Sequence, residues 1–177
     1  TFISLGIFVA GFGGALTLDD IARASMITLA AVLLSLVYYS IALLFSVFSK
    51  KSSHSALLAI AVWIIMAIVL PLVATMVAFS IAGPPPRISG TQRGVAAFRE
   101  WSKKFNQVRE GIMRISPDTY FGKVANTLLR EISIAGRETV SLTDALNSVA
   151  PSFAVLTIVP LILLIVSFTI FVRQEEK

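Results

Sequence analysis

The sequence predicts an all-α, polytopic membrane protein with about four transmembrane helices and an extramembrane helical segment before the last of them. Hydrophobic residues make up 56% of its 177 residues and charged residues 14%, against ~45–50% and ~25% in a typical soluble domain. Four runs, of 18, 26, 32 and 28 residues, contain no Asp, Glu, Lys or Arg. Because a spanning helix needs about 20 predominantly apolar residues, these runs predict membrane spans.

The first span is predicted at residues 2–17. The chain starts at Thr1 inside an apolar run, so we expect it to be a piece of a longer polypeptide that begins part-way along a membrane helix. Gly6, Ala10 and Gly14 recur every four residues, and small residues at this spacing let two helix backbones approach closely. We therefore expect helix packing along this row.

The second span is predicted at 25–48, after a polar turn with Asp19 and Asp20. Small and hydroxyl residues recur on one face of this helix at intervals of 7, 4, 3 and 4 residues: Thr28, Ser35, Tyr39, Ala42 and Ser46. This stripe has two interpretations. It lines a transport pathway, or it forms a tight seam between helices, and the seam is the interpretation we favour.

The third span is predicted at 55–82, after the polar turn SKKSSH at 49–54. Lys50, Lys51 and His54 lie in this turn, where cations suit both a helix C-terminus and a headgroup boundary. Pro71 lies inside the span and should kink it.

Residues 84–150 are predicted to lie outside the membrane, because positions 87–144 hold 10 of the 15 basic and 6 of the 10 acidic residues. Apolar residues at three- and four-residue spacing predict amphipathic helices at 93–113 and 117–133. Their apolar faces include Phe98, Trp101, Phe105, Tyr120 and Phe121. We expect these side chains to dock on an apolar surface, either the tips of the spans or the membrane interface.

The last span is predicted at 151–172, with a short tail ending at Lys177. The Ser141–Asp144 stretch has the spacing of a capping box. It therefore predicts that a helix starts there and leads into the last span. The chain thus divides into three parts: 1–83 with three spans, 84–150 outside the membrane, and 151–177 with the last span.

The composition excludes several classes of function. The chain has no cysteine and one histidine, so thiolate and multi-histidine metal sites are excluded within it, and we expect no cofactor on this chain. The GFGG stretch at 11–14 lies in an apolar run without a following lysine and does not fit a phosphate loop. Nucleic-acid binding does not fit a membrane protein of this kind. The predicted spans carry no Asp, Glu, Lys, Arg or His, which disfavours coupling to an ion gradient.

Several short motifs resemble one known family. They are LDDIARA at 18–24, FSVFSKKSSHSALLAI at 45–60, ISPDTYFGKVANTLL at 115–129 and IFVRQEEK at 170–177. In their order and in the spans around them, the chain resembles the C-terminal two-thirds of an ABC transporter permease of type 2, the export-associated family. The two N-terminal spans of that family, and the coupling helix after the second, have no counterpart here.

The resemblance implies a non-catalytic, multi-pass permease subunit of an ATP-driven exporter in the lipid bilayer of a cell membrane, with a prokaryotic source expected. Its partners would be an ATP-binding ABC subunit, touched by Lys50, Lys51 and His54, and a second permease copy or a sibling. Residues 49–54 and the tail would face the cytoplasm and residues 84–150 the outer side, although a simple count of basic residues favours the opposite orientation. The alternative is a non-transporting membrane scaffold or anchor whose segment 87–144 binds a partner.

Overall fold

The computed structural model describes residues 18–49, 52–86, 92–130 and 142–175, and over these ranges it contains helices and no strand. The elements are α2 (Leu18–Phe48), α3 (Ser52–Ile64), the π-helical turn η1 (Ile65–Val69), α4 (Leu70–Ala82), α5 (Gln92–Met113), α6 (Pro117–Arg130) and α7 (Leu142–Glu175). The predicted all-α class is thus confirmed for the described residues.

Three helices are long and apolar enough to cross a membrane, and they cover Leu18–Phe48, Ser53–Ala82 and Thr143–Arg173. They contain the predicted spans 25–48, 55–82 and 151–172. The span predicted at 2–17, with its row Gly6, Ala10 and Gly14, lies outside the described residues, so the count of four stays a prediction.

The last helix begins earlier than the span predicted within it. α7 starts at Leu142 and continues through Pro151 and Pro160 as one helix. A proline inside a helix removes one backbone hydrogen bond, and a membrane helix tolerates it where neighbouring groups satisfy the freed carbonyl. The boundary predicted between residues 150 and 151 therefore falls inside a single helix.

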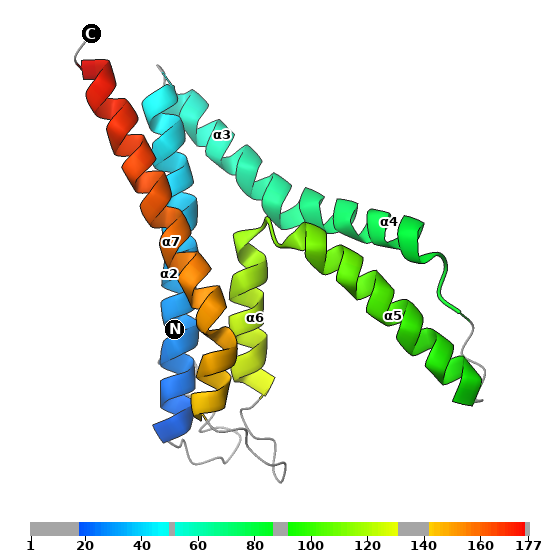
Figure 1. Cartoon of the computed structure of the whole chain (residues 1–177). Helices are drawn as coiled ribbons and strands as arrows, with labels where there is room; N and C mark the ends of the chain where they lie inside the picture. The colour runs from blue at the N-terminus through cyan, green and yellow to red at the C-terminus, as the bar shows by residue number, and fades with distance from the viewer. Residues whose placement is uncertain (1–17, 50–51, 87–91, 131–141, 176–177) are drawn as a thin grey trace, which may run out of the picture.

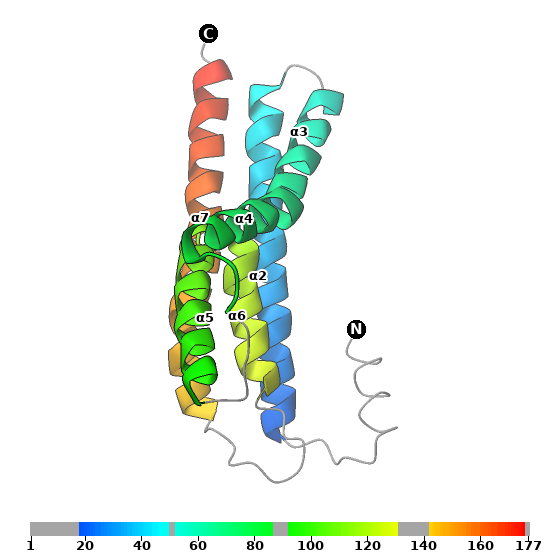
Figure 2. The same ribbon diagram turned by 90° about the vertical axis from the view of Figure 1, so that its right-hand side faces the viewer.

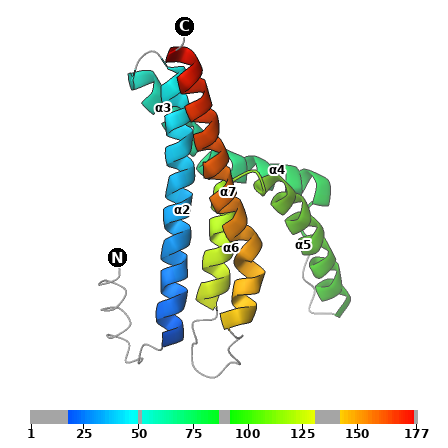
Figure 3. The ribbon, with the colours of Figure 1, turned by 60° about the vertical axis from the view of Figure 1, so that its left-hand side comes forward.

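The core forms where α6 packs against α2 and α7, which lie side by side and run in the same direction (Figures 1 and 3). Its fully buried apolar side chains come from all three helices: Ala30, Val37, Val124, Leu128, Ala145, Val149 and Leu156. Val124 and Leu128 lie one helical turn apart in α6, on the same face as Phe121. The amphipathic pattern of α6 thus faces the two spans.

The third span bends in its middle, and the bend has a local cause. Pro71 has no N–H to donate to the preceding turn and its ring crowds that turn. The helix widens just before it into η1, where the Leu70 N–H donates to the Ile65 carbonyl five residues earlier. After this turn α4 leaves the direction of α3 (Figures 1 and 2), so the kink predicted at Pro71 is present as a π-helical turn directly before it.

The two ends of the helical bundle carry different parts of the chain. The end of α2, the start of α3 and the end of α7 lie at one end, while the start of α2, the end of α6 and the start of α7 lie at the other (Figures 1–3). The sequence-based topology requires the same pairing, since it places the 49–54 turn and the C-terminal tail on one side of the membrane.

Candidate functional site

A polar contact joins a membrane span to the segment predicted to lie outside the membrane. The Tyr38 hydroxyl of α2 donates a hydrogen bond of 2.5 Å to Oδ2 of Asp118 in the first turn of α6. The Ser116 hydroxyl, just before this helix, donates to the same oxygen at 3.1 Å. Asp118 also lies at the positive end of α6, where a carboxylate is favoured. Two hydroxyls and the helix terminus thus stabilise this carboxylate, and the Tyr38 hydroxyl joins it to α2.

The contact lies far from either end of the span. Tyr38 is ten residues before Phe48, the last residue of α2, so about 15 Å of helix separates them at ~1.5 Å per residue. From this level α6 runs alongside α2 and α7 toward the other end of the bundle (Figures 1 and 3). The sequence placed 117–133 outside the bilayer, docked on the tips of the spans or on the membrane interface, and its position relative to the bilayer stays a prediction. In the structure α6 packs against the sides of α2 and α7, and it brings a carboxylate to a helix whose own apolar stretch has none.

The small and hydroxyl stripe of α2 faces away from the rest of the described chain. Thr28, Ser35, Tyr39 and Ser46 are exposed and Ala42 is partly buried. The side chains of α2 that are buried against other helices, Arg23, Ala30, Val37 and Ser40, lie on a different face. The stripe is therefore not a seam between helices within the described residues.

Two hydroxyls of the stripe are also bonded within their own helix. Thr28 Oγ1 donates to the Ala24 carbonyl at 2.9 Å, and Ser35 Oγ donates to the Ala31 carbonyl at 2.9 Å. This back-bonding to the residue four positions earlier lets a hydroxyl lie on an apolar surface with its donor satisfied. Apart from Tyr39, the stripe thus offers small side chains to a neighbouring helix.

The two amphipathic faces have separate partners. On α5, the rings of Trp101 and Phe105 contact Phe79 of α4, and the Phe98 ring contacts Trp101. The Trp101 and Phe105 rings stack with centroids 5.1 Å apart, and the Trp101 indole N–H donates to the Gly83 carbonyl at 2.8 Å. The docking expected for these side chains is therefore found, on the tip of the third span.

On α6, Tyr120 and Phe121 are partly buried against the α2–α6–α7 core. One amphipathic helix thus packs on α4 and the other on the α2–α7 pair. The sequence analysis described residues 84–150 as one extramembrane part. In the structure its two helices, α5 and α6, pack on different partners.

The residues predicted to touch an ATPase are only partly described. His54 is exposed in the first turn of α3, at the end of the bundle that also carries the end of α7. Lys50 and Lys51 lie outside the described residues. Their role as a contact site stays a prediction.

One comparison with known proteins identifies the family. The family model described as "ABC-2 family transporter protein" matches residues 1–175. The chain belongs to the ABC-2 transporter family. A search of curated proteins and a search of solved structures gave no match. The family match confirms the resemblance that the sequence motifs indicated.

Membership of the ABC-2 family makes this chain a membrane permease of an ABC transporter, with an ATP-binding subunit as the partner that the family implies. In the part of the permease that the structure describes, no three His, Asp or Glu side chains gather in a way that would hold a metal ion. Polar features of the described residues include the Tyr38–Asp118 contact and the exposed stripe of α2.

Two functional candidates escaped the sequence reasoning. Tyr38 and Asp118 are 80 positions apart, and no spacing rule links residues at that distance. The signal available was indirect: Ser116-Pro117-Asp118 predicts a helix start, and a tyrosine within an apolar span needs a partner for its hydroxyl. Which carboxylate meets it depends on how α6 packs.

Proposed function

We propose that this chain is the permease subunit of an ATP-driven exporter in a prokaryotic cell membrane, and that it has no catalytic activity or cofactor of its own. The family match over residues 1–175 carries this proposal. Export as the direction follows from the type 2 resemblance of the motifs at 45–60 and 115–129. Energy would come from ATP hydrolysed on a separate subunit, in keeping with predicted spans that hold no Asp, Glu, Lys, Arg or His.

The end of the bundle with the α2–α3 turn is the proposed contact with the ATPase. A short, basic and serine-rich turn between two spans is suited to fit a partner's surface, and His54 is exposed there. Lys50 and Lys51 would add positive charge to the same contact. Force applied at this end would reach α2 and α3 directly, because the turn joins them.

The stripe of α2 is the proposed contact with a second permease copy. Tyr39 is 59% exposed, and its neighbours on the stripe have small side chains, which permits close packing between helices. Relative movement of two copies along this face would open a path across or out of the bilayer. The row Gly6, Ala10 and Gly14 offers a second seam of the same type.

A pair of single-cysteine variants tests this contact. The natural chain has no cysteine, so no background thiol has to be removed. Ser35→Cys places a thiol on the exposed stripe, and Ser40→Cys makes the same change on the same helix at a position that is fully buried. We expect oxidant to cross-link Ser35→Cys into a dimer in membranes and to leave Ser40→Cys monomeric. Equal cross-linking of both variants would contradict the assignment of the face.

Co-purification tests the function itself. The full-length permease, extracted in mild detergent, should bring down a nucleotide-binding subunit. If none is recovered, the scaffold alternative takes its place. That alternative draws on the long charged face of α5, where Arg99, Lys103 and Lys104 are exposed, and it predicts recovery of a partner that requires segment 87–144.

A further inference from the structure

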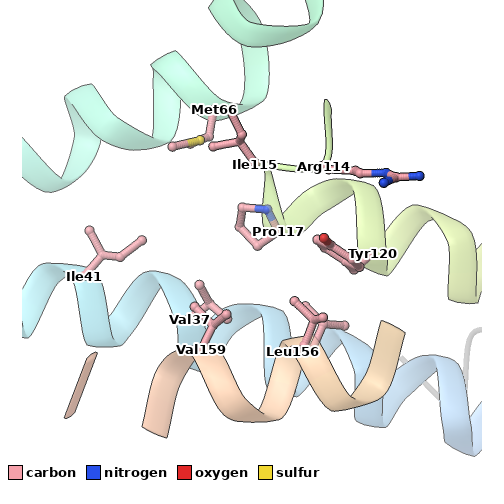
Figure 4. A pocket seen from close by; sticks show the side chains of 10 residues that line it. Val37, Ile41, Met66, Arg114, Ile115, Pro117, Tyr120, Leu156 and Val159 are labelled. Carbon is pink, nitrogen blue, oxygen red and sulfur yellow. The ribbon is translucent and has the colours of Figure 1, made fainter. Parts of the chain in front are cut away.

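The helices α4 and α5 form an arm that extends away from α2, α6 and α7 (Figures 1 and 3). Within the described residues, α5 packs on α4, and α4 packs on α5 and η1. At the root of the arm, Met66 of η1 lies beside Ile115, and the Arg114 guanidinium points away from the apolar side chains gathered there (Figure 4). The arm thus presents surfaces that the rest of the described chain does not cover.

The side of the arm formed by α4 is apolar. Ala74 and Ala78 are fully buried on the side of α4 that meets α5, while Leu72 and Met76, on the opposite side of the helix, are 60% and 69% exposed. Residues 55–86 carry no charged side chain. Large apolar side chains on an uncharged helix are unfavourable in water and stable in contact with hydrocarbon.

The side of the arm formed by α5 is basic. Positions 94–114 hold five basic and two acidic residues. Arg99 and Lys103 are one helical turn apart and exposed. Each lies two positions before a ring of the Trp101–Phe105 stack, about 200° around the helix from it. The rings therefore face α4 while these two cations point away from it.

The packing of α5 along α4 restricts how the arm can lie in a membrane. If α4 crossed the hydrocarbon, α5 would carry its Arg, Lys and Glu side chains into it, at a high cost. The chain can cross without α4, because α3 and η1 have 13 and 5 residues, which together reach the ~17–25 residues of a span. Directly after η1, α4 leaves the direction of α3 (Figures 1 and 2). An arm that lies along the membrane surface avoids the cost of buried charge.

We propose that the arm lies along the membrane surface, with the exposed side of α4 on lipid acyl chains and the basic side chains of α5 among anionic phospholipid headgroups. Packed helix axes are ~8–10 Å apart, and each headgroup layer is about 5–8 Å thick. With α4 at the edge of the hydrocarbon, α5 therefore lies at the level of the phosphates. Arg and Lys form charge-assisted hydrogen bonds with phosphate oxygens, and basic residues near an anionic membrane surface are attracted to it.

The proposal depends on neither the direction of transport nor the ATPase partner. It is tested by tryptophan quenching in vesicles that hold the reconstituted full-length protein. Phosphatidylglycerol and phosphatidylcholine are mixed equally, and one or the other is brominated in its acyl chains, so that it quenches a tryptophan on contact. The chain has two tryptophans, and Trp63→Phe leaves Trp101 in the arm. Any tryptophan outside residues 1–177 is replaced by phenylalanine as well.

We expect both brominated lipids to quench Trp101, with a relative binding constant of about three in favour of phosphatidylglycerol at ~0.1 M salt. At ~1 M salt the two lipids should quench nearly equally, because the attraction between basic residues and an anionic surface is screened.

Substitutions in the Trp63→Phe background locate the headgroup contact. The double variant Arg99→Gln/Lys103→Gln should lose the preference for phosphatidylglycerol and still be quenched by both lipids. Glu100→Gln, which removes an exposed acid from α5, should increase the preference. Lys123→Gln removes an exposed cation from α6, outside the arm, and should leave the preference unchanged. A single size-exclusion peak and an unchanged helical circular dichroism signal verify that each variant is folded.

Trp101→Phe, which leaves Trp63 on the uncharged helix α3, is the positive control for lipid contact. If Trp63 is quenched and Trp101 is not, the arm stands in water or against another protein, and the proposal is overturned. Equal quenching of Trp101 by the two lipids at the lower salt concentration would overturn the part of the proposal that concerns anionic headgroups. An equal loss of preference in Arg99→Gln/Lys103→Gln and in Lys123→Gln would overturn the assignment to α5.

Discussion

The Tyr38–Asp118 hydrogen bond is expected to contribute measurably to the stability of the folded chain. Tyr38→Phe removes the hydroxyl that donates to Oδ2 of Asp118 and keeps the ring. A hydrogen bond to a charged group contributes ~1.5–3 kcal/mol. Because Ser116 still donates to the same oxygen, the carboxylate keeps one partner, and we expect a loss of about 1–2 kcal/mol in the free energy of unfolding.

The reciprocal change should cost more. Asp118→Ala removes the acceptor for both hydroxyls and the favourable charge in the first turn of α6, the latter worth ~0.3–1 kcal/mol. We expect a loss of about 2–3 kcal/mol. In the double variant the loss should be smaller than the sum of the two single losses. The difference between that sum and the loss in the double variant is the coupling energy, which we expect to be about 1–2 kcal/mol, within the range for residues in contact.

The assay is unfolding by SDS in mixed micelles, followed by the fluorescence of the two tryptophans. Tyr39→Phe is the matched control. It makes the same change at the next residue, which is 59% exposed, and it should shift the free energy by no more than ~0.5 kcal/mol. A coupling energy indistinguishable from zero, or an equal loss in Tyr38→Phe and Tyr39→Phe, would refute the reasoning that α6 is fastened to α2 at this point.

Two further predictions concern the third span. Trp101→Phe removes the bond to the Gly83 carbonyl and should lower the free energy of unfolding by ~1 kcal/mol in the same assay, whereas Trp63→Phe, at a half-exposed position, should change little. Pro71→Ala restores a backbone donor and should straighten the helix, so spin labels at Leu57 and Met76 should move apart, toward the ~28 Å of a straight α-helix; an unchanged distance would show that the bend has another cause.

The elements of this fold were predictable where the cause is local. Charge-free runs predicted three described spans, and the spacing of Phe98, Trp101 and Phe105 predicted α5 and its apolar face. Pro71 predicted a kink because its missing N–H acts within one turn of the helix. Each of these signals depends on residues within about two helical turns.

The positions of the elements relative to one another were not predictable in the same way. The amphipathic pattern of α6 required an apolar partner, but the tips of the spans, the membrane interface and the sides of α2 and α7 satisfy that pattern equally. The choice depends on contacts between residues far apart in the sequence, such as Tyr38 with Asp118. For the same reason the stripe through Ser35 and Tyr39 was predicted as a face, while its outward direction follows from the packing of Val37 and Ser40 on the other face.

The central claim, that this chain is a permease driven by a separate ATPase, is tested most directly by ATP hydrolysis in reconstituted vesicles. The nucleotide-binding subunit would be measured alone, with the natural permease, and with the Ser35→Cys permease before and after oxidation. Hydrolysis should rise when the permease is added, and it should fall after oxidation of Ser35→Cys and return on reduction, with Ser40→Cys insensitive to both treatments. A rate that is the same with and without the permease would contradict the account.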